Sequence, residues 1–156
     1  MKSVLKFIPG LLLCFLMISC ESEDDGPAVS TIDVEQVKAV VVSGTWSVAT
    51  YEEDGVDQTS NFSGYGFSFN ADGTINVSNG STSISGAWSI LSDSNSSDDD
   101  SNDSDDIDFN IFFTSPANFA EISEDWEIVS YSSTRIELRH VSGGDGSVDR
   151  LIFEKQ

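Results

Sequence analysis

The sequence predicts an all-β domain: an eight-stranded antiparallel up-and-down barrel preceded by one short helix. Apolar residues recur at every second position in eight short segments, the pattern of strands buried on one face. Turn-forming residues separate these segments, and no crossover helix lies between them, which favours antiparallel pairing of consecutive strands. Closing eight strands into a barrel removes exposed sheet edges, whereas a β-sandwich built from the same strands is the alternative.

A single helix is expected ahead of the strands, from Ile32 to Ser43. Ser30 is a candidate N-cap with Asp33 three residues later, an acidic variant of the capping box. Gly44 suits the helix end. The apolar residues at helical spacing are Val34, Val37 and Val41.

Eight alternating segments follow Gly44, and each is a predicted strand. Their inward-phase residues are Trp46 and Val48; Tyr65, Phe67 and Phe69; Ile75 and Val77; Ile84, Trp88 and Ile90; Ile107, Phe109, Ile111 and Phe113; Trp126 and Ile128; Ile136 and Leu138; Leu151 and Phe153.

Turn residues lie between the predicted strands. Gly73, after Ala71 and Asp72, stands where a three-residue hairpin needs a positive φ, and Asn79-Gly80 is a two-residue hairpin signal. Residues 131–134 and 142–147 are expected to turn the chain between the last three strands. Between residues 115 and 123 a short helix over Asn118–Ile122 is expected, either as a lid on one end of the barrel or as a plain connector.

The first nineteen residues have the form of a secretory signal. Lys2 and Lys6 precede an apolar run from Phe7 to Ile18, which is too short to span a bilayer. Ser19-Cys20 at its end resembles the lipobox of bacterial lipoproteins. The resemblance implies that residues 1–19 are removed and that acyl chains on Cys20 hold the protein on a membrane. An ordinary thiol near a signal-peptidase site is the alternative.

An acidic tether is expected over residues 20–30. Glu21 to Asp25 contains four acidic residues, and Gly26-Pro27 then breaks regular structure. The segment resembles the acidic export tag of surface lipoproteins in some Gram-negative bacteria, which implies display on the outer face of the outer membrane. A solvated spacer is the alternative. Residues 31–156 then form the barrel domain.

Charge and cysteine content argue against a nucleic-acid partner and against a disulfide framework. The formal charge is −20, and loss of Lys2 and Lys6 leaves five basic against 27 acidic residues, or −22. A chain this acidic repels phosphate backbones, so nucleic acid is not an expected partner. Cys14 lies in the signal and Cys20 is assigned to lipid, so no disulfide framework is expected.

An acidic insertion separates the fourth and fifth predicted strands. Residues 92–106 consist only of Ser, Asp and Asn, seven of them Asp, so the segment is expected to be a disordered, solvated loop. Its oxygen-rich composition suggests weak cation binding as an alternative. The EF-hand frame that starts at Asp98 has Asp103 where the turn needs Gly and Phe109 where the loop needs Glu. No specific metal site or cofactor is therefore predicted.

The barrel resembles lipocalins in two short motifs. Gly44-Thr45-Trp46 at the first strand is similar to the Gly-x-Trp opening of that family, and Gly86-Ala87-Trp88 repeats the pattern on the fourth strand. The resemblance covers residues 32–156 and implies a barrel that binds a small molecule. It also implies a late arginine packed over the opening tryptophan, with Arg139 and Arg150 as the two candidates.

The inward-facing aromatic residues raise the question of whether the barrel is hollow. An eight-stranded barrel is just wide enough to be filled by side chains or to hold one small molecule. Nine large rings either fill it completely or leave a pocket at one mouth. The residues expected to contact such a ligand are Trp46, Tyr65, Phe67, Trp88, Phe109, Trp126 and His140.

The function predicted from these features is non-catalytic binding of a small apolar or glycan ligand by a membrane-anchored lipoprotein. The alternative is a structural or accessory protein with a filled barrel that contacts a surface protein partner. An enzyme is not expected, because His140 is the only histidine and no nucleophile-elbow, zinc-protease or phosphate-loop motif occurs.

Overall fold

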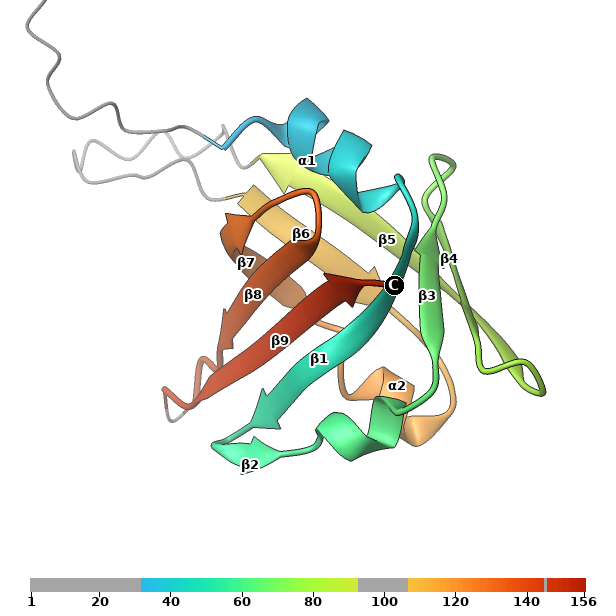
Figure 1. Cartoon of the computed structure of the whole chain (residues 1–156). Helices are drawn as coiled ribbons and strands as arrows, with labels where there is room; N and C mark the ends of the chain where they lie inside the picture. Colours follow the sequence, from blue (N-terminus) through green and yellow to red (C-terminus); the bar gives the residue numbers. More distant parts are fainter. Residues whose placement is uncertain (1–31, 93–106, 145) are drawn as a thin grey trace, which may run out of the picture. The chain divides into compact units, whose positions relative to one another are not determined.

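The observed fold is the closed barrel predicted from the sequence (Figure 1). The computed structural model describes residues 32–92, 107–144 and 146–156. There, β1 (Thr45–Glu53) pairs with β3 (Gly66–Phe69) on one side and β9 (Val148–Lys155) on the other, which closes the sheet and excludes the β-sandwich. Between them, each strand pairs antiparallel with the next: β4 (Thr74–Ser78), β5 (Ser83–Ser92), β6 (Ile107–Phe112), β7 (Asp125–Tyr131) and β8 (Arg135–Val141).

A short hairpin that the sequence analysis missed extends β1 beyond the barrel. β2 (Val56–Asp57) pairs with the end of β1, with Glu53 opposite Val56. Asp54 and Gly55 form the two-residue turn, with φ of 50° and 77°. Two positive φ values are characteristic of the type I′ turn, which Asp-Gly favours. A 3₁₀ helix, η1 (Thr59–Phe62), follows and directs Phe62 into the core.

The N-terminal helix α1 (Val34–Val41) lies within the predicted range but is capped by a different residue. Asp33 is the N-cap, and its carboxylate accepts hydrogen bonds from the main-chain N–H groups of Glu35 and Gln36. Ser30, the predicted cap, falls outside the described residues. Asp33 takes this role because its backbone is still extended where the helix begins. The helix covers one end of the barrel, with Val37 and Val41 fully buried (Figure 1).

The opposite end of the barrel is closed by α2 (Ala117–Ala120) and η1 (Figure 1). The helix is a single turn within the predicted lid segment and starts one residue earlier than Asn118. Phe119 and, just after the helix, Ile122 are fully buried. The ring of Phe119 contacts those of Phe62, Tyr65, Phe67 and Phe113, at centroid distances of 5.3, 5.2, 5.8 and 5.3 Å. The segment is therefore a plug rather than a connector.

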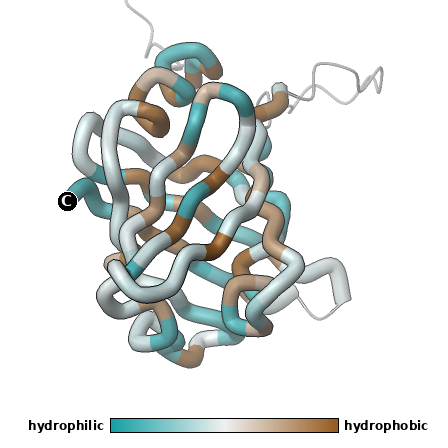
Figure 2. The backbone as a smooth tube through the Cα atoms, turned by 90° about the vertical axis from the view of Figure 1, so that its right-hand side faces the viewer, coloured by the Kyte–Doolittle hydropathy of each residue, from teal (hydrophilic) through white to brown (hydrophobic). Residues whose placement is uncertain are grey.

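Aromatic side chains fill the interior between these two ends. Apolar and polar residues alternate along the strands, as the colours of the backbone tube show in Figure 2. Phe67 and Phe69 both contact Phe153, at 5.3 and 5.6 Å, and Phe69 also contacts Trp88 and Phe109. Ring contacts thus run without interruption from Phe119 in the plug to Phe109 on β6, and the barrel has a packed aromatic core.

Most predicted turns are confirmed, and one is shifted. Gly73 has a φ of 85°, as its hairpin requires, and the chain turns between β7 and β8 and between β8 and β9, within the predicted ranges. Gly80 has a φ of 87°, but four residues, 79–82, separate β4 from β5. The side chain of Asn79 accepts from the main chain of Ser81 and Thr82, which widens the expected two-residue turn.

The predictions for the signal, Cys20, the tether and the acidic insertion fall on residues 1–31 and 93–106, outside the described residues. Within the described ranges, neither helix has the length and apolar character needed to cross a bilayer.

Candidate functional site

Each of the three tryptophans uses its indole N–H to fix a segment at an end or edge of the barrel. The acceptors are main-chain carbonyl oxygens, so the rings are held in place as well as buried. These bonds tie β1 to the last turn of α1, β5 to the turn after β3, and β7 to the segment after α2. The pairs are Trp46 with Val41 at 2.8 Å, Trp88 with Asn70 at 2.9 Å, and Trp126 with Ile122 at 3.1 Å.

The glycines of the two Gly-x-Trp motifs leave room for other side chains. A Cβ atom on Gly44 would lie 2.6 Å from Cε of Lys155, and one on Gly86 would lie 2.5 Å from Cε1 of Phe113. Lys155 uses this space to place its ammonium nitrogen 5.7 Å from the centroid of the Trp46 ring. The resemblance had assigned this place to Arg139 or Arg150, and both assignments are wrong.

Arg139 and Arg150 lie elsewhere because they form ion pairs with other strands. Arg139 pairs with Glu127, and Arg150 pairs with Glu137 at 2.7 Å. Lys155, in contrast, is the residue of β9 that lies opposite Trp46 in the strand register. Its long aliphatic chain reaches over the ring while the charge stays near the surface, where it donates to Ser43 Oγ at 2.9 Å.

The residues predicted to contact a ligand do not converge on one pocket inside the barrel. Four of them are fully buried in the aromatic core: Trp46, Phe67, Phe109 and Trp126. Tyr65 is half-buried beside the plug residue Phe119. Trp88 and His140 lie at separate places, so two surface features are the candidates for a site.

The first candidate is a groove of about 660 Å³ between α1 and β5, bounded also by the turn after β3. Ligand sites for small molecules are typically of this size and mostly apolar. Trp88 lies in its wall, and Leu91, also in the wall, is 58% exposed. The remaining lining residues are Glu35, Lys38, Ala39, Val42, Ala71, Asp72, Gly73, Ser89 and Ile90.

The charged groups around this groove already have partners. Lys38 and Glu35 form an ion pair of 3.2 Å along α1. The carboxylate of Asp72 accepts from the hydroxyl and the main-chain N–H of Thr74, and these bonds lower the pKa of Asp72. Most of the remaining side chains in the lining are apolar. The groove therefore suits an apolar molecule better than a charged one.

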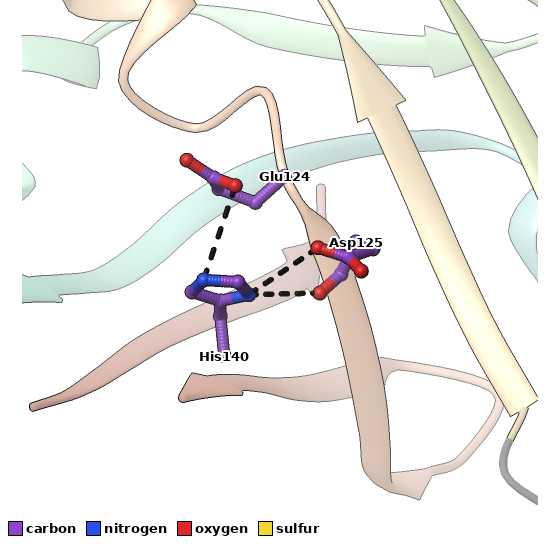
Figure 3. A group of neighbouring side chains, drawn as sticks. All are labelled: Glu124, Asp125 and His140. Atoms are coloured by element: carbon purple, nitrogen blue, oxygen red, sulfur yellow. Dashed lines mark hydrogen bonds and ion pairs between the residues drawn. The ribbon is translucent and has the colours of Figure 1, made fainter. Parts of the chain in front are cut away.

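The second candidate is a cluster of Glu124, Asp125 and His140 at the end of the barrel closed by α2 (Figure 3). Nδ1 of His140 lies 3.0 Å from the main-chain oxygen of Asp125 and 3.5 Å from Oδ1 of the same residue. Nε2 lies 3.9 Å from Oε2 of Glu124. The imidazole also contacts Trp126, with ring centroids 6.0 Å apart.

Further carboxylates gather at this end, and their charges act on Glu53. Burial raises the pKa of Glu53, and the negative charges of Glu121 and Asp149 raise it further. Burial likewise raises the pKa of the Tyr51 phenol, and the negative charge of Glu53 raises it further. In the described residues, no lysine or arginine forms an ion pair with Glu53, Glu121 or Glu124. This end of the barrel consequently carries a local negative field.

Sequence reasoning had named Trp88 and His140 but not their neighbours. The groove depends on how α1 packs on β5, and no local pattern gives that packing. Glu124 and Asp125 lie 15 or more positions before His140, and only the pairing of β7 with β8 brings the three together. The expected antiparallel pairing of consecutive strands was the available signal, since it places the start of β7 beside the end of β8.

Comparisons with known proteins give one structural similarity. No family model matches the chain, and no curated protein matches it. One crystal structure, of a DUF4847 family protein from Bacteroides vulgatus, is similar with 21% sequence identity and a TM-score of 0.49. The alignment covers 77% of this chain and 99% of that one. A likeness at this level carries no argument about function.

Proposed function

We propose that this protein is a non-catalytic binding module that takes a small apolar molecule in the groove between α1 and β5. The observation that carries the proposal is the contrast between a core filled by aromatic rings and an apolar groove beside it. Because the rings occupy the interior, a ligand of ordinary size has its best place outside the lumen, at the mouth covered by α1. Leu91 and Trp88 then offer an apolar surface to it.

The anchor is part of the same proposal. A lipid on Cys20 would hold the module at a membrane, and the acidic residues 21–25 support display on the outer face of a Gram-negative outer membrane. The Gly-x-Trp motifs support a relationship to lipocalin-like lipoproteins. A Cys20→Ala variant tests the anchor: the protein is expected in the soluble fraction or uncleaved, whereas unchanged membrane retention contradicts lipid attachment.

Tryptophan emission tests ligand binding by the purified full chain. A medium-chain alkyl alcohol is titrated as an uncharged apolar probe. Soluble oligosaccharides are titrated separately to test for a glycan ligand. A saturable change is expected with the alcohol, and it should disappear in Trp88→Phe because Trp88 lines the groove whereas Trp46 and Trp126 do not. A saturable response to an oligosaccharide alone would replace the apolar ligand with a glycan.

Two matched variants locate the binding site. Leu91 and Phe112 are 58% and 59% exposed, but only Leu91 lines the groove. Leu91→Ser is expected to weaken binding by about tenfold or more, since burying a leucine contributes ~1.5–3 kcal/mol. Phe112→Ser should leave the affinity unchanged. Equal effects of both substitutions would mean that the probe binds the surface without a specific site.

The filled core also favours a second function, that of an accessory protein acting through its surface. A solid barrel needs no ligand to be stable, and its loops are then the working parts. Cross-linking on intact cells followed by purification separates the two functions. One stoichiometric protein partner, with no response to any probe, favours the accessory role, whereas saturable probe binding without a partner favours the module.

A further inference from the structure

We propose that His140, Glu124 and Asp125 form a binding site for a divalent transition-metal ion such as Zn²⁺. One ring nitrogen of His140 and one oxygen of each carboxylate lie within 4.8 Å of one another, and Figure 3 shows both carboxylates beside the imidazole. An imidazole with two carboxylates is a ligand set that suits zinc and its neighbours, whereas calcium and magnesium prefer oxygen ligands alone.

The distance between Nε2 of His140 and Glu124 matches two ligands of one ion better than a hydrogen-bonded pair. Two atoms bound at ~2.0–2.1 Å to a tetrahedral ion are roughly 3.4 Å apart. Nε2 of His140 lies 3.9 Å from Glu124 Oε2, beyond the usual hydrogen-bond range. A small adjustment of the exposed Glu124 side chain therefore brings both atoms to one ion. The exposed carboxylate of Asp125 lies beside Nδ1 and has to turn toward Nε2 to reach the same ion.

The hydrogen bond on the other side of the ring fixes which nitrogen is free. Nδ1 of His140 lies 3.0 Å from the main-chain oxygen of Asp125. A carbonyl oxygen only accepts, so Nδ1 carries the proton and, in the neutral ring, Nε2 presents its lone pair toward Glu124. Metal-bound histidines commonly have this arrangement, with the second nitrogen donating to a carbonyl or carboxylate.

The surroundings of the cluster are acidic, and the ion pairs of the described lysines and arginines are made with other carboxylates. The negative charges of Glu121 and Asp149 help to raise the pKa of Glu53, and no described lysine or arginine is paired with Glu53, Glu121, Glu124 or Asp125. A field of this kind concentrates divalent cations at the site, and the imidazole then selects among them.

The ring signals of His140 give a site-specific test, because it is the only histidine of the chain. The full chain, labelled with ¹⁵N, is titrated with ZnCl₂ and, separately, with MgCl₂. With Zn²⁺, a saturable shift is expected that is larger at Nε2 than at Nδ1. No shift with Zn²⁺, or the same shift with Mg²⁺, overturns the proposal.

Three variants separate ligation from general attraction of cations by an acidic chain. Glu124→Gln and Asp125→Asn each remove a ligand and should weaken binding about tenfold or more. Glu53→Gln removes the same charge from the same end of the barrel without removing a ligand, so it should have a much smaller effect. If Glu53→Gln weakens Zn²⁺ binding as much as Glu124→Gln does, the ion is held by the field alone and the site does not exist.

Discussion

The ammonium group of Lys155 lies 5.7 Å from the centre of the Trp46 ring, and the two residues face each other in the register of β9 and β1. Trp46 in turn donates to the last turn of α1, and Lys155 donates to Ser43 just after that helix. One pair of residues thus links the closing strands of the barrel to the helix that covers them.

This pair predicts a measurable contribution to stability. Lys155→Met keeps an apolar chain over the ring but removes the charge, and we expect a loss of about 0.5–1 kcal/mol in the free energy of unfolding. Lys38→Met is the control, since Lys38 forms only an exposed pair with Glu35 and should cost less than ~0.5 kcal/mol. Urea unfolding of the full chain measures both. Equal small losses would show that the contact with Trp46 contributes nothing.

Gly86→Ala should destabilise the barrel by about 1–3 kcal/mol. The added Cβ would lie 2.5 Å from the Phe113 ring and 2.6 Å from the main-chain oxygen of Phe112, which cannot move without disturbing β6. Gly143→Ala is the matched control, because a Cβ there meets nothing within 4 Å and its φ is not positive. Thermal unfolding compares the two, and a neutral Gly86→Ala would mean that β5 and β6 separate without cost.

The plug at the α2 end should be a major source of stability. Phe119→Ala removes a fully buried ring that contacts four others, and a loss of ~3–5 kcal/mol is expected from lost burial and the resulting cavity. Phe112→Ala truncates the same side chain where it is 59% exposed and should change stability by no more than about 0.5 kcal/mol. Denaturant midpoints at equal protein concentration provide the comparison. Similar losses for both variants would mean that α2 is loosely attached.

Two glutamates should affect the pH dependence of stability in opposite directions. Arg150 lowers the pKa of Glu137 below its ordinary value of 4.5, so Glu137 stabilises the fold above that pH and loses its contribution as the pH falls through the lowered pKa. The pKa of Glu53 is raised by burial, so its contribution is present in acid and is lost as the pH rises through the raised pKa.

Substitution by glutamine checks both signs. At neutral pH, Glu137→Gln is expected to destabilise the protein and Glu53→Gln to stabilise it, and both differences should shrink in acid, where the native carboxyl groups become protonated. The measurement is urea unfolding between pH 3 and pH 7. Destabilisation by Glu53→Gln at neutral pH would indicate that its carboxylate has a favourable partner.

The strands were predictable because period-two alternation is local, and the closure of the barrel was expected because it removes exposed sheet edges. Phe67, Phe69, Phe109 and Phe153, which the alternation predicts to face inward, are buried in the structure. The β1–β2 hairpin was missed although Asp54-Gly55 is a strong turn signal, because β2 contributes only two exposed residues and has no alternation of its own.

The candidate sites were less predictable because they depend on contacts between distant residues. Lys155 replaces an expected arginine over Trp46, and only the β1–β9 register identifies it. The groove requires α1 to lie against β5, and the histidine cluster requires β7 beside β8. Hydrophobic periodicity shows which face of a strand is buried, but it does not show which surface a neighbouring helix leaves open.

The position of a bound ligand tests the central claim most directly. A crystal of the full chain grown with a brominated medium-chain alcohol gives an anomalous signal that locates the bromine. We predict a bromine peak between α1 and β5, beside Trp88 and Leu91. A peak inside the barrel, among Phe67, Phe69 and Phe153, would show that the aromatic core opens to admit ligands and would contradict this account.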